Sequence, residues 1–151
     1  MISQKTRYGL QALFYLARAY NQGSVLISEL AQNERIPQKF LEAILLNLKN
    51  HGLLKSKKGK GGGYALGKPP EQITMGQVMR LLEGPLAPVP CVSQTAYRKC
   101  DECRDEKSCC LRILMKEVRD AMANVLDKTT LADVIQRGKA LNGKESLTYF
   151  I

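Results

Sequence analysis

The chain has 151 residues, 44% of them hydrophobic, and a formal net charge of +9 at pH 7. This length accommodates one domain with a small addition and excludes a second catalytic domain. The N-terminal segment mixes Lys5, Arg7 and Arg18 with apolar residues at helical spacing, unlike a signal peptide, and no stretch approaches membrane-spanning length. We therefore expect a cytoplasmic protein with no membrane partner.

The positive charge lies mainly in the first half of the chain. Residues 1–70 contain 11 Lys and Arg against 3 Asp and Glu, a difference of +8, whereas residues 71–151 contain 12 against 11, a difference of +1. A basic half joined to a nearly neutral half predicts that one half binds a polyanion, and nucleic acid is the leading candidate.

Apolar spacing in this basic half predicts a helix-turn-helix. A first helix is expected from about Ser3 to Tyr20, a short second helix after Ser28 as its N-cap, and a third from Pro37. The predicted buried side of the third helix is Phe40, Leu41, Ile44, Leu45 and Leu48. Its outward side then includes Gln38, Lys39 and Glu42, which are candidates for contacts with base edges in the major groove.

Two short strands are predicted next, over residues 53–58 and 64–66, joined by a basic, glycine-rich tip. We term this hairpin the wing. Lys57, Lys58 and Lys60 would neutralise phosphates or enter a minor groove, and the glycines allow a close approach of the backbone. A flexible, solvated hairpin is the alternative. The glycine run lacks the Gly-Lys-Ser/Thr ending of a P-loop, so no nucleotide is expected.

A long helix is predicted from near Ser108, and its apolar residues recur at alternating steps of four and three. This seam consists of Leu111, Met115, Val118, Met122 and Val125. It predicts a helix that pairs two copies of the chain, with packing against the chain's own first domain as the alternative. A short helix is expected after Thr129 or Thr130, and no clear pattern follows Gly138.

The predicted fold class is mainly α: a winged helix-turn-helix domain with a small two-stranded wing, plus a long dimerisation helix. The predicted organisation is a DNA-binding domain over 1–84, a cysteine-rich loop over 85–108, the dimerisation helix and a short helix over 109–137, and a flexible tail over 138–151.

All five cysteines lie between Cys91 and Cys110. In a reducing compartment such clustering favours metal or redox chemistry over disulfides. The spacing C-x8-C-x2-C-x5-C offers four thiolates, Cys91, Cys100, Cys103 and Cys109, for an iron-sulfur cluster of the [2Fe-2S] or [4Fe-4S] type, with Cys110 as a substitute for Cys109. Structural zinc and a metal-free thiol switch are the alternatives.

The same spacing contains a CxxC pair, Cys100 and Cys103, which in other proteins carries out thiol-disulfide exchange. The parallel βαβ setting of such oxidoreductases is lacking, so we do not expect an enzyme.

Four stretches in order resemble the Rrf-two family of winged-helix transcriptional regulators, in its IscR-like and NsrR-like members: KTRYGL at 5–10, IPQKFLE at 36–42, KGKGGGYAL at 58–66 and TLADV at 130–134. The resemblance implies a homodimer that binds a palindromic, double-stranded DNA operator with an affinity that depends on a cluster. It also implies that Glu42 helps to select bases, against the alternative of a solvated helix face.

Together the residues and the resemblance predict that DNA is contacted by Gln38, Lys39, Glu42, Lys57, Lys58, Lys60, Gly62 and Tyr64. The resemblance does not supply every expected cluster ligand. Where relatives have a histidine ligand this chain has Ile113, and the single histidine, His51, is expected to have only a packing or surface role.

Overall fold

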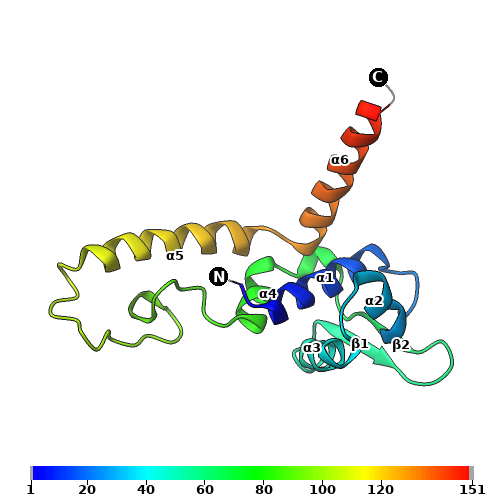
Figure 1. Cartoon of the computed structure of the whole chain (residues 1–151), viewed down its shortest axis with the longest axis horizontal. Coiled ribbons are helices and arrows are strands. Elements are labelled where there is room, and N and C mark those ends of the chain that lie inside the picture. The colour runs from blue at the N-terminus through cyan, green and yellow to red at the C-terminus, as the bar shows by residue number, and fades with distance from the viewer. Residues whose placement is uncertain (1, 150–151) are drawn as a thin grey trace.

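The computed structural model describes residues 2–149, with side chains over 2–143. Its elements are α1 (Gln4–Arg18), α2 (Ile27–Glu34), α3 (Gln38–Asn50), β1 (Leu54–Lys57), β2 (Gly63–Leu66), the 3-10 turn η1 (Pro70–Gln72), α4 (Met75–Leu82), the 3-10 turn η2 (Pro90–Val92), α5 (Cys110–Lys128) and α6 (Leu131–Tyr149). The first half packs together, while α5 and α6 project from it in different directions (Figure 1). The predicted mainly α, winged helix-turn-helix fold is confirmed.

The turn between α2 and α3 is set by two backbone positions. Arg35 adopts a left-handed conformation, with φ of 56°, at the end of α2, and Pro37 then precedes α3. The predicted N-cap at Ser28 is wrong, because the amide of Leu30 already donates to the carbonyl of Leu26 and the first helical turn therefore starts before Ser28.

The α3 helix buries Leu41, Ile44, Leu45 and Leu48, as its spacing predicts. The prediction for Phe40 is wrong, since its side chain is 62% exposed. Phe40 lies in the first turn, on the flank of the apolar stripe rather than at its centre. Its ring meets Tyr8 of α1 instead, with the two ring centroids 6.4 Å apart.

The wing is an antiparallel pair in which Leu54 faces Leu66 and Lys57 faces Gly63. Its base is joined to the segment before α2, because the Val25 amide donates to the Tyr64 carbonyl and the Tyr64 amide donates to the Val25 carbonyl, both at 2.8 Å. Gly63 has φ of 132°, and a Cβ there would lie 2.1 Å from the Val25 oxygen. Only glycine therefore fits at this crossing.

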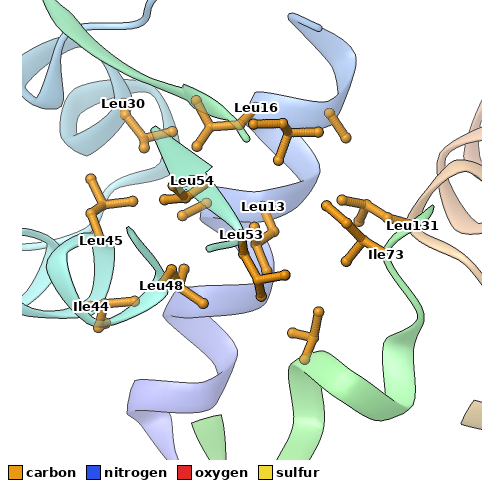
Figure 2. Close-up of a cluster of buried hydrophobic side chains, with 14 of the residues drawn as sticks. Leu13, Leu16, Leu30, Ile44, Leu45, Leu48, Leu53, Leu54, Ile73 and Leu131 are labelled. Carbon is orange, nitrogen blue, oxygen red and sulfur yellow. The ribbon is translucent and has the colours of Figure 1, made fainter. Parts of the chain in front are cut away.

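The hydrophobic core lies between α1, α2, α3, the wing and the start of α6 (Figure 2). Leu131, the first residue of α6, is fully buried in it and packs near Ile73. Backbone hydrogen bonds fix this return: the Leu131 amide donates to the Ile73 carbonyl, and the Met75 amide donates to the Thr129 carbonyl, both at 2.8 Å. Residues expected to belong to a separate C-terminal part thus complete the core of the first half.

The C-terminal helices differ in extent from the sequence prediction. The α5 helix begins at Cys110, two residues after Ser108, and α6 runs to Tyr149, whereas a short helix followed by an irregular tail was expected. Thr130 and Asp133 cap each other's amides at the start of α6, and Gly138 does not end the helix because Ala, Leu, Lys and Glu follow it and favour helix. Within residues 2–149, no helix is both long and apolar enough to cross a membrane.

Candidate DNA-binding surface and cysteine site

The first two turns of α3 present the three outward residues that the sequence predicts. Gln38, Lys39 and Glu42 are all exposed. The side-chain amide of Gln38 donates to Glu42 Oε1 at 3.3 Å, which is one helical turn away. This hydrogen bond holds the Glu42 carboxylate near the start of the helix, so an acceptor and a cation, Lys39, stand side by side on the exposed surface.

The wing places its predicted DNA contacts in two different settings. Lys57, Lys58 and Lys60 are exposed. Gly62 is buried, and a Cβ there would lie 2.4 Å from the Lys57 carbonyl oxygen, so glycine permits the tight tip. Tyr64 is half-buried and its backbone pairs with Val25. The lysines are therefore open to a polyanion, Gly62 and Tyr64 have structural contacts, and the DNA contact of these residues stays a prediction.

The cysteine segment surrounds a cavity of about 740 Å³ between η2 and the start of α5. Cys91 lies on η2, Cys100 and Cys103 lie on a loop without helix or strand, and Cys109 occupies the N-cap position of α5. These four thiols all line the cavity, whereas Cys110 does not. All five cysteines are free thiols. The cysteines that line the cavity are thus the four that the spacing selects, and Cys110 is not one of them.

The thiol of Cys103 has a perturbed pKa at this site. Partial burial raises the pKa of its thiol above the ordinary value, and the nearby Glu106 carboxylate raises it further. Glu106 itself accepts a hydrogen bond from the Tyr97 hydroxyl. Binding a metal requires deprotonation of this thiol, so cation binding there would release a proton.

Four thiols around one cavity are a suitable donor set for an iron-sulfur unit or zinc. The thiols are nevertheless not gathered: within the part of the chain that the structure describes, no three His, Cys, Asp or Glu side chains are close enough to hold one ion. Binding would therefore draw the Cys100–Cys103 turn, in which the Cys103 amide donates to the Cys100 carbonyl, towards Cys91 and Cys109.

Two arginines of α5 fix the Cys91 turn to that helix. Arg119 Nη1 donates to the Val92 carbonyl at 2.7 Å, and Arg112 Nε donates to the Cys91 carbonyl at 3.4 Å. Arg119 has only 14% of its side chain exposed. Sequence reasoning missed both residues, although their spacing of seven places them on one face of the helix and could have indicated a shared partner.

An ion pair connects α5 to the first half of the molecule. Arg80 of α4 donates to both carboxylate oxygens of Asp127, at 2.6 and 2.9 Å, and this contact lowers the pKa of Asp127. Gly76 lets the helices approach, because a Cβ there would lie 1.8 Å from Asp127 Oδ1. Neither residue was singled out from the sequence, since a pair separated by 47 positions has no local signal.

The predicted seam of α5 is only partly exposed. Leu111, Val118 and Val125 are exposed, whereas Met115 and Met122 are half-buried. Two other exposed residues, Leu114 and Ala121, fall between the first three. We term this set the α5 stripe: Leu111, Leu114, Val118, Ala121 and Val125. It also repeats at alternating steps of three and four, so a heptad seam remains, rotated from the predicted one.

His51 is not among the residues of the cysteine site. It follows α3 as its C-cap residue, is exposed, and has Nδ1 2.8 Å from the Asn47 carbonyl oxygen. It does not line the cysteine cavity. Of the packing or surface position expected for His51, the structure shows the surface position.

Known proteins share this architecture over nearly the whole chain. Among solved structures, CymR (YrzC), described as the global cysteine regulator of B. subtilis, superimposes with a TM-score of 0.76 and 36% identity over 91% of this chain and 97% of that one. IscR of T. potens superimposes with a TM-score of 0.72 and 28% identity over 91% and 88% of the two chains.

Proteins with similar sequences point to the same family as the similar structures. A putative rrf2-like HTH-type transcriptional regulator of Rhodobacter capsulatus is 39% identical over 91% of this chain and 94% of its own length, and CymR of Bacillus subtilis is 38% identical over 88% of each. These names describe a non-enzymatic role, as predicted. The Rrf2 family profile, described as an iron-dependent transcriptional regulator, matches residues 2–137. The chain therefore belongs to the Rrf2 (Rrf-two) family of transcriptional regulators.

Proposed function

We propose that this regulator is a cytoplasmic homodimer that binds a palindromic DNA operator and holds an iron-sulfur cluster on Cys91, Cys100, Cys103 and Cys109. The observation that carries the proposal is the cavity that these four thiols share, next to the start of α5. Neither a nucleotide nor a membrane is a partner in this proposal.

The DNA-binding part of the proposal rests on charge and exposure. Gln38, Lys39 and Glu42 at the start of α3 would meet base edges in the major groove, and the exposed wing lysines would meet phosphates or the minor groove. Gly62 and Tyr64 would act by shaping the wing around these lysines. Lys39 suits guanine, and Glu42 suits the amino group of cytosine.

The dimer part of the proposal rests on the α5 stripe. Its five residues are exposed on one side of a helix that projects from the first half of the molecule (Figure 1). Burying the same stripe from two copies removes this apolar surface from water and generates two-fold symmetry. A palindromic operator with half-sites about 34 Å apart would match that symmetry.

The proposed switch rests on a series of contacts that connects the Cys91 turn, α5, α4 and the start of α1. Arg112 and Arg119 fix the Cys91 turn to α5, and Asp127 near the other end of α5 is fixed by Arg80 to α4. Glu83 follows α4 and accepts hydrogen bonds from Ser3 and Thr6 at the start of α1. In the proposed switch, these contacts would carry a change at the cysteines to α1 of the DNA-binding half.

The bound cluster would supply a redox-active centre at this site. The residues of the chain would position the cluster. Cys91 lies on η2 and Cys109 at the N-cap of α5, and Cys100 and Cys103 lie on the loop that lines the cavity and would close on binding. Closure of this loop would fix the start of α5 and so set the distance between the two α3 helices of a dimer.

Reversible thiol oxidation is the second candidate, because the chain is similar to CymR. One of these similar structures is an oxidised form of Staphylococcus aureus CymR, with a TM-score of 0.70 and 32% identity over 89% of this chain. The five free thiols provide the groups that such a switch requires. A structural zinc ion on the same four thiols is the further alternative.

The decisive experiment is purification without oxygen, followed by a visible spectrum and analysis of iron, sulfide and zinc. Charge-transfer bands with matching iron and sulfide support the cluster; stoichiometric zinc or no metal contradicts it, and the latter favours the thiol switch. Cys109→Ala should lose the metal and Cys110→Ala should retain it, because only Cys109 lines the cavity.

Operator binding is tested with duplexes selected from a random-sequence pool. The loaded protein and the metal-free Cys100→Ala variant should differ in affinity for the selected duplex, and both should lose affinity steeply as salt rises. Equal affinities, with the cluster demonstrably absent from the variant, would exclude the switch while leaving the regulator intact.

A further inference from the structure

Phe40 is an exposed aromatic residue within a polar and cationic surface. Its side chain is 62% exposed in the first turn of α3, next to Lys39 and two positions before Glu42. Lys5 and Arg7 of the neighbouring α1 are also exposed. The exposed ring of Phe40 is therefore available for contact with a ligand that approaches the start of α3.

The Phe40 ring is held in place by α1. Tyr8 is half-buried and packs against the core, and its ring meets Phe40 at a centroid distance of 6.4 Å and an interplanar angle of 60°. This tilted arrangement is a favourable geometry for an aromatic pair. The contact restricts the Phe40 side chain before any ligand arrives, which lowers the entropic cost of using it for recognition.

We propose that Phe40 is a specificity-determining residue that contacts the C5-methyl group of a thymine in each half-site. The inference rests on the proposed function, because α3 must enter the major groove. Within that groove the thymine methyl is the apolar group that base edges present, and a phenylalanine contacts it well. The surrounding cations favour a nucleic acid over a hydrophobic protein surface as the occupant.

In this proposal, neighbouring side chains of α3 recognise different chemical groups of the operator. Lys39 and Glu42 recognise hydrogen-bonding groups, whereas Phe40 recognises shape and apolar surface. Deoxyuridine pairs as thymine does and lacks only the methyl group, so it isolates the Phe40 contribution. Removal of one buried methyl group should weaken binding about fourfold.

The experiment replaces each thymine of the selected duplex in turn by deoxyuridine and measures affinity in solution. Wild-type protein should lose about fourfold at one symmetric position in each half-site. Phe40→Ala should bind the thymine and deoxyuridine duplexes equally at that position. The variant should remain folded because the side chain is mostly exposed, and a thermal melt checks this.

Leu46→Ala is the matched control, since Leu46 is also apolar, lies on α3 and is 50% exposed. It should discriminate between the two duplexes as wild type does. Tyr8→Ala should discriminate less, whereas Tyr8→Phe retains the ring and should discriminate fully.

Three outcomes would overturn the inference. Wild-type protein could bind the selected duplex and show no sensitivity to any deoxyuridine, Phe40→Ala could retain the discrimination, or Leu46→Ala could abolish it. All three leave the DNA-binding regulator standing, whereas failure of the wild type to bind DNA overturns both proposals.

Discussion

The winged half and the cysteine loop are stabilised in opposite ways. The first has a continuous core in which Leu13, Leu41, Leu45, Leu48 and Leu53 are fully buried. In the second, every residue from 94 to 102 is exposed and none lies in a helix or strand. Folding of the winged half is thus driven by its own core. The loop has no such core, and in the proposed function a cluster on its cysteines would order it.

The largest expected effect comes from the core of the winged half. Leu45→Ala should lower the free energy of unfolding by about 2–5 kcal/mol, because it removes a fully buried side chain and leaves a cavity. Leu46→Ala, the adjacent and half-exposed position, should change it by less than about 0.5 kcal/mol. Denaturant titration of the metal-free protein measures both, and similar losses would contradict the burial of α3.

The next effect should appear in the loop. Trypsin should cut metal-free protein rapidly after Arg98, Lys99 and Arg104, which are exposed, and cluster reconstitution should slow these cuts by about tenfold or more because the closed loop resists local opening. Timed digestion with mass spectrometry identifies each cut.

Cleavage after Lys58 and Lys60 at the wing tip is the internal control and should not change on reconstitution. If the loop cuts proceed equally fast with and without the cluster, ligand binding does not order the loop and the contrast between the two regions fails.

The contact between α5, which follows the cysteine loop, and α4 of the winged half should give a smaller effect. Asp127→Asn should cost about 0.5–1 kcal/mol in the free energy of unfolding, because both partners are partly exposed and solvent screens the pair. Gly76→Ala should act in the same direction without changing charge, since its Cβ displaces the Asp127 carboxylate.

The Arg80 and Asp127 pair also offers a functional readout. The preferred half-site spacing of selected duplexes should broaden in both variants if the contact fixes α5 relative to α4. Unchanged spacing in Asp127→Asn and Gly76→Ala would show that other contacts set the angle of α5.

The smallest effect concerns acid. The Thr6 hydroxyl, with help from Ser3, lowers the pKa of Glu83 in the folded state. A carboxylate with a lowered folded pKa contributes stability above its unfolded pKa, and that contribution is lost as pH falls through the folded value. Glu83→Gln should therefore flatten the acid side of the stability profile, measured as melting temperature from neutral pH to about pH 3. An unchanged profile would show that this contact is not maintained in solution.

The sequence was sufficient where local pattern dominates. Apolar periodicity predicted α1 and the buried stripe of α3, and glycine placement predicted the wing. Phe40 was misassigned because periodicity cannot tell the flank of a stripe from its centre. The length of α6 was missed because its end has weak apolar periodicity and depends on helix propensity.

The long-range contacts could not be read from the sequence. The cysteine spacing selected the four residues that line the cavity, but the attachment of Cys91 through Arg112 and Arg119, the Arg80 and Asp127 pair, and the return of Leu131 to the core depend on tertiary structure. Charges distant in sequence offer many alternative pairings, and only the folded backbone selects among them.

The backbone bridge between Thr74 and Thr130 attaches the C-terminal end of α5 to the segment before α4. The C-terminal end of α5 is thus fixed next to the core, whereas Cys109 and Cys110 lie at its N-terminal end. A helix of 19 residues is about 28 Å long. If the cysteine end moves by about 3 Å, the helix axis therefore turns by about 6° about its C-terminal end. In the proposed switch, loop closure of that size would therefore tilt α5 by a few degrees relative to the DNA-binding half.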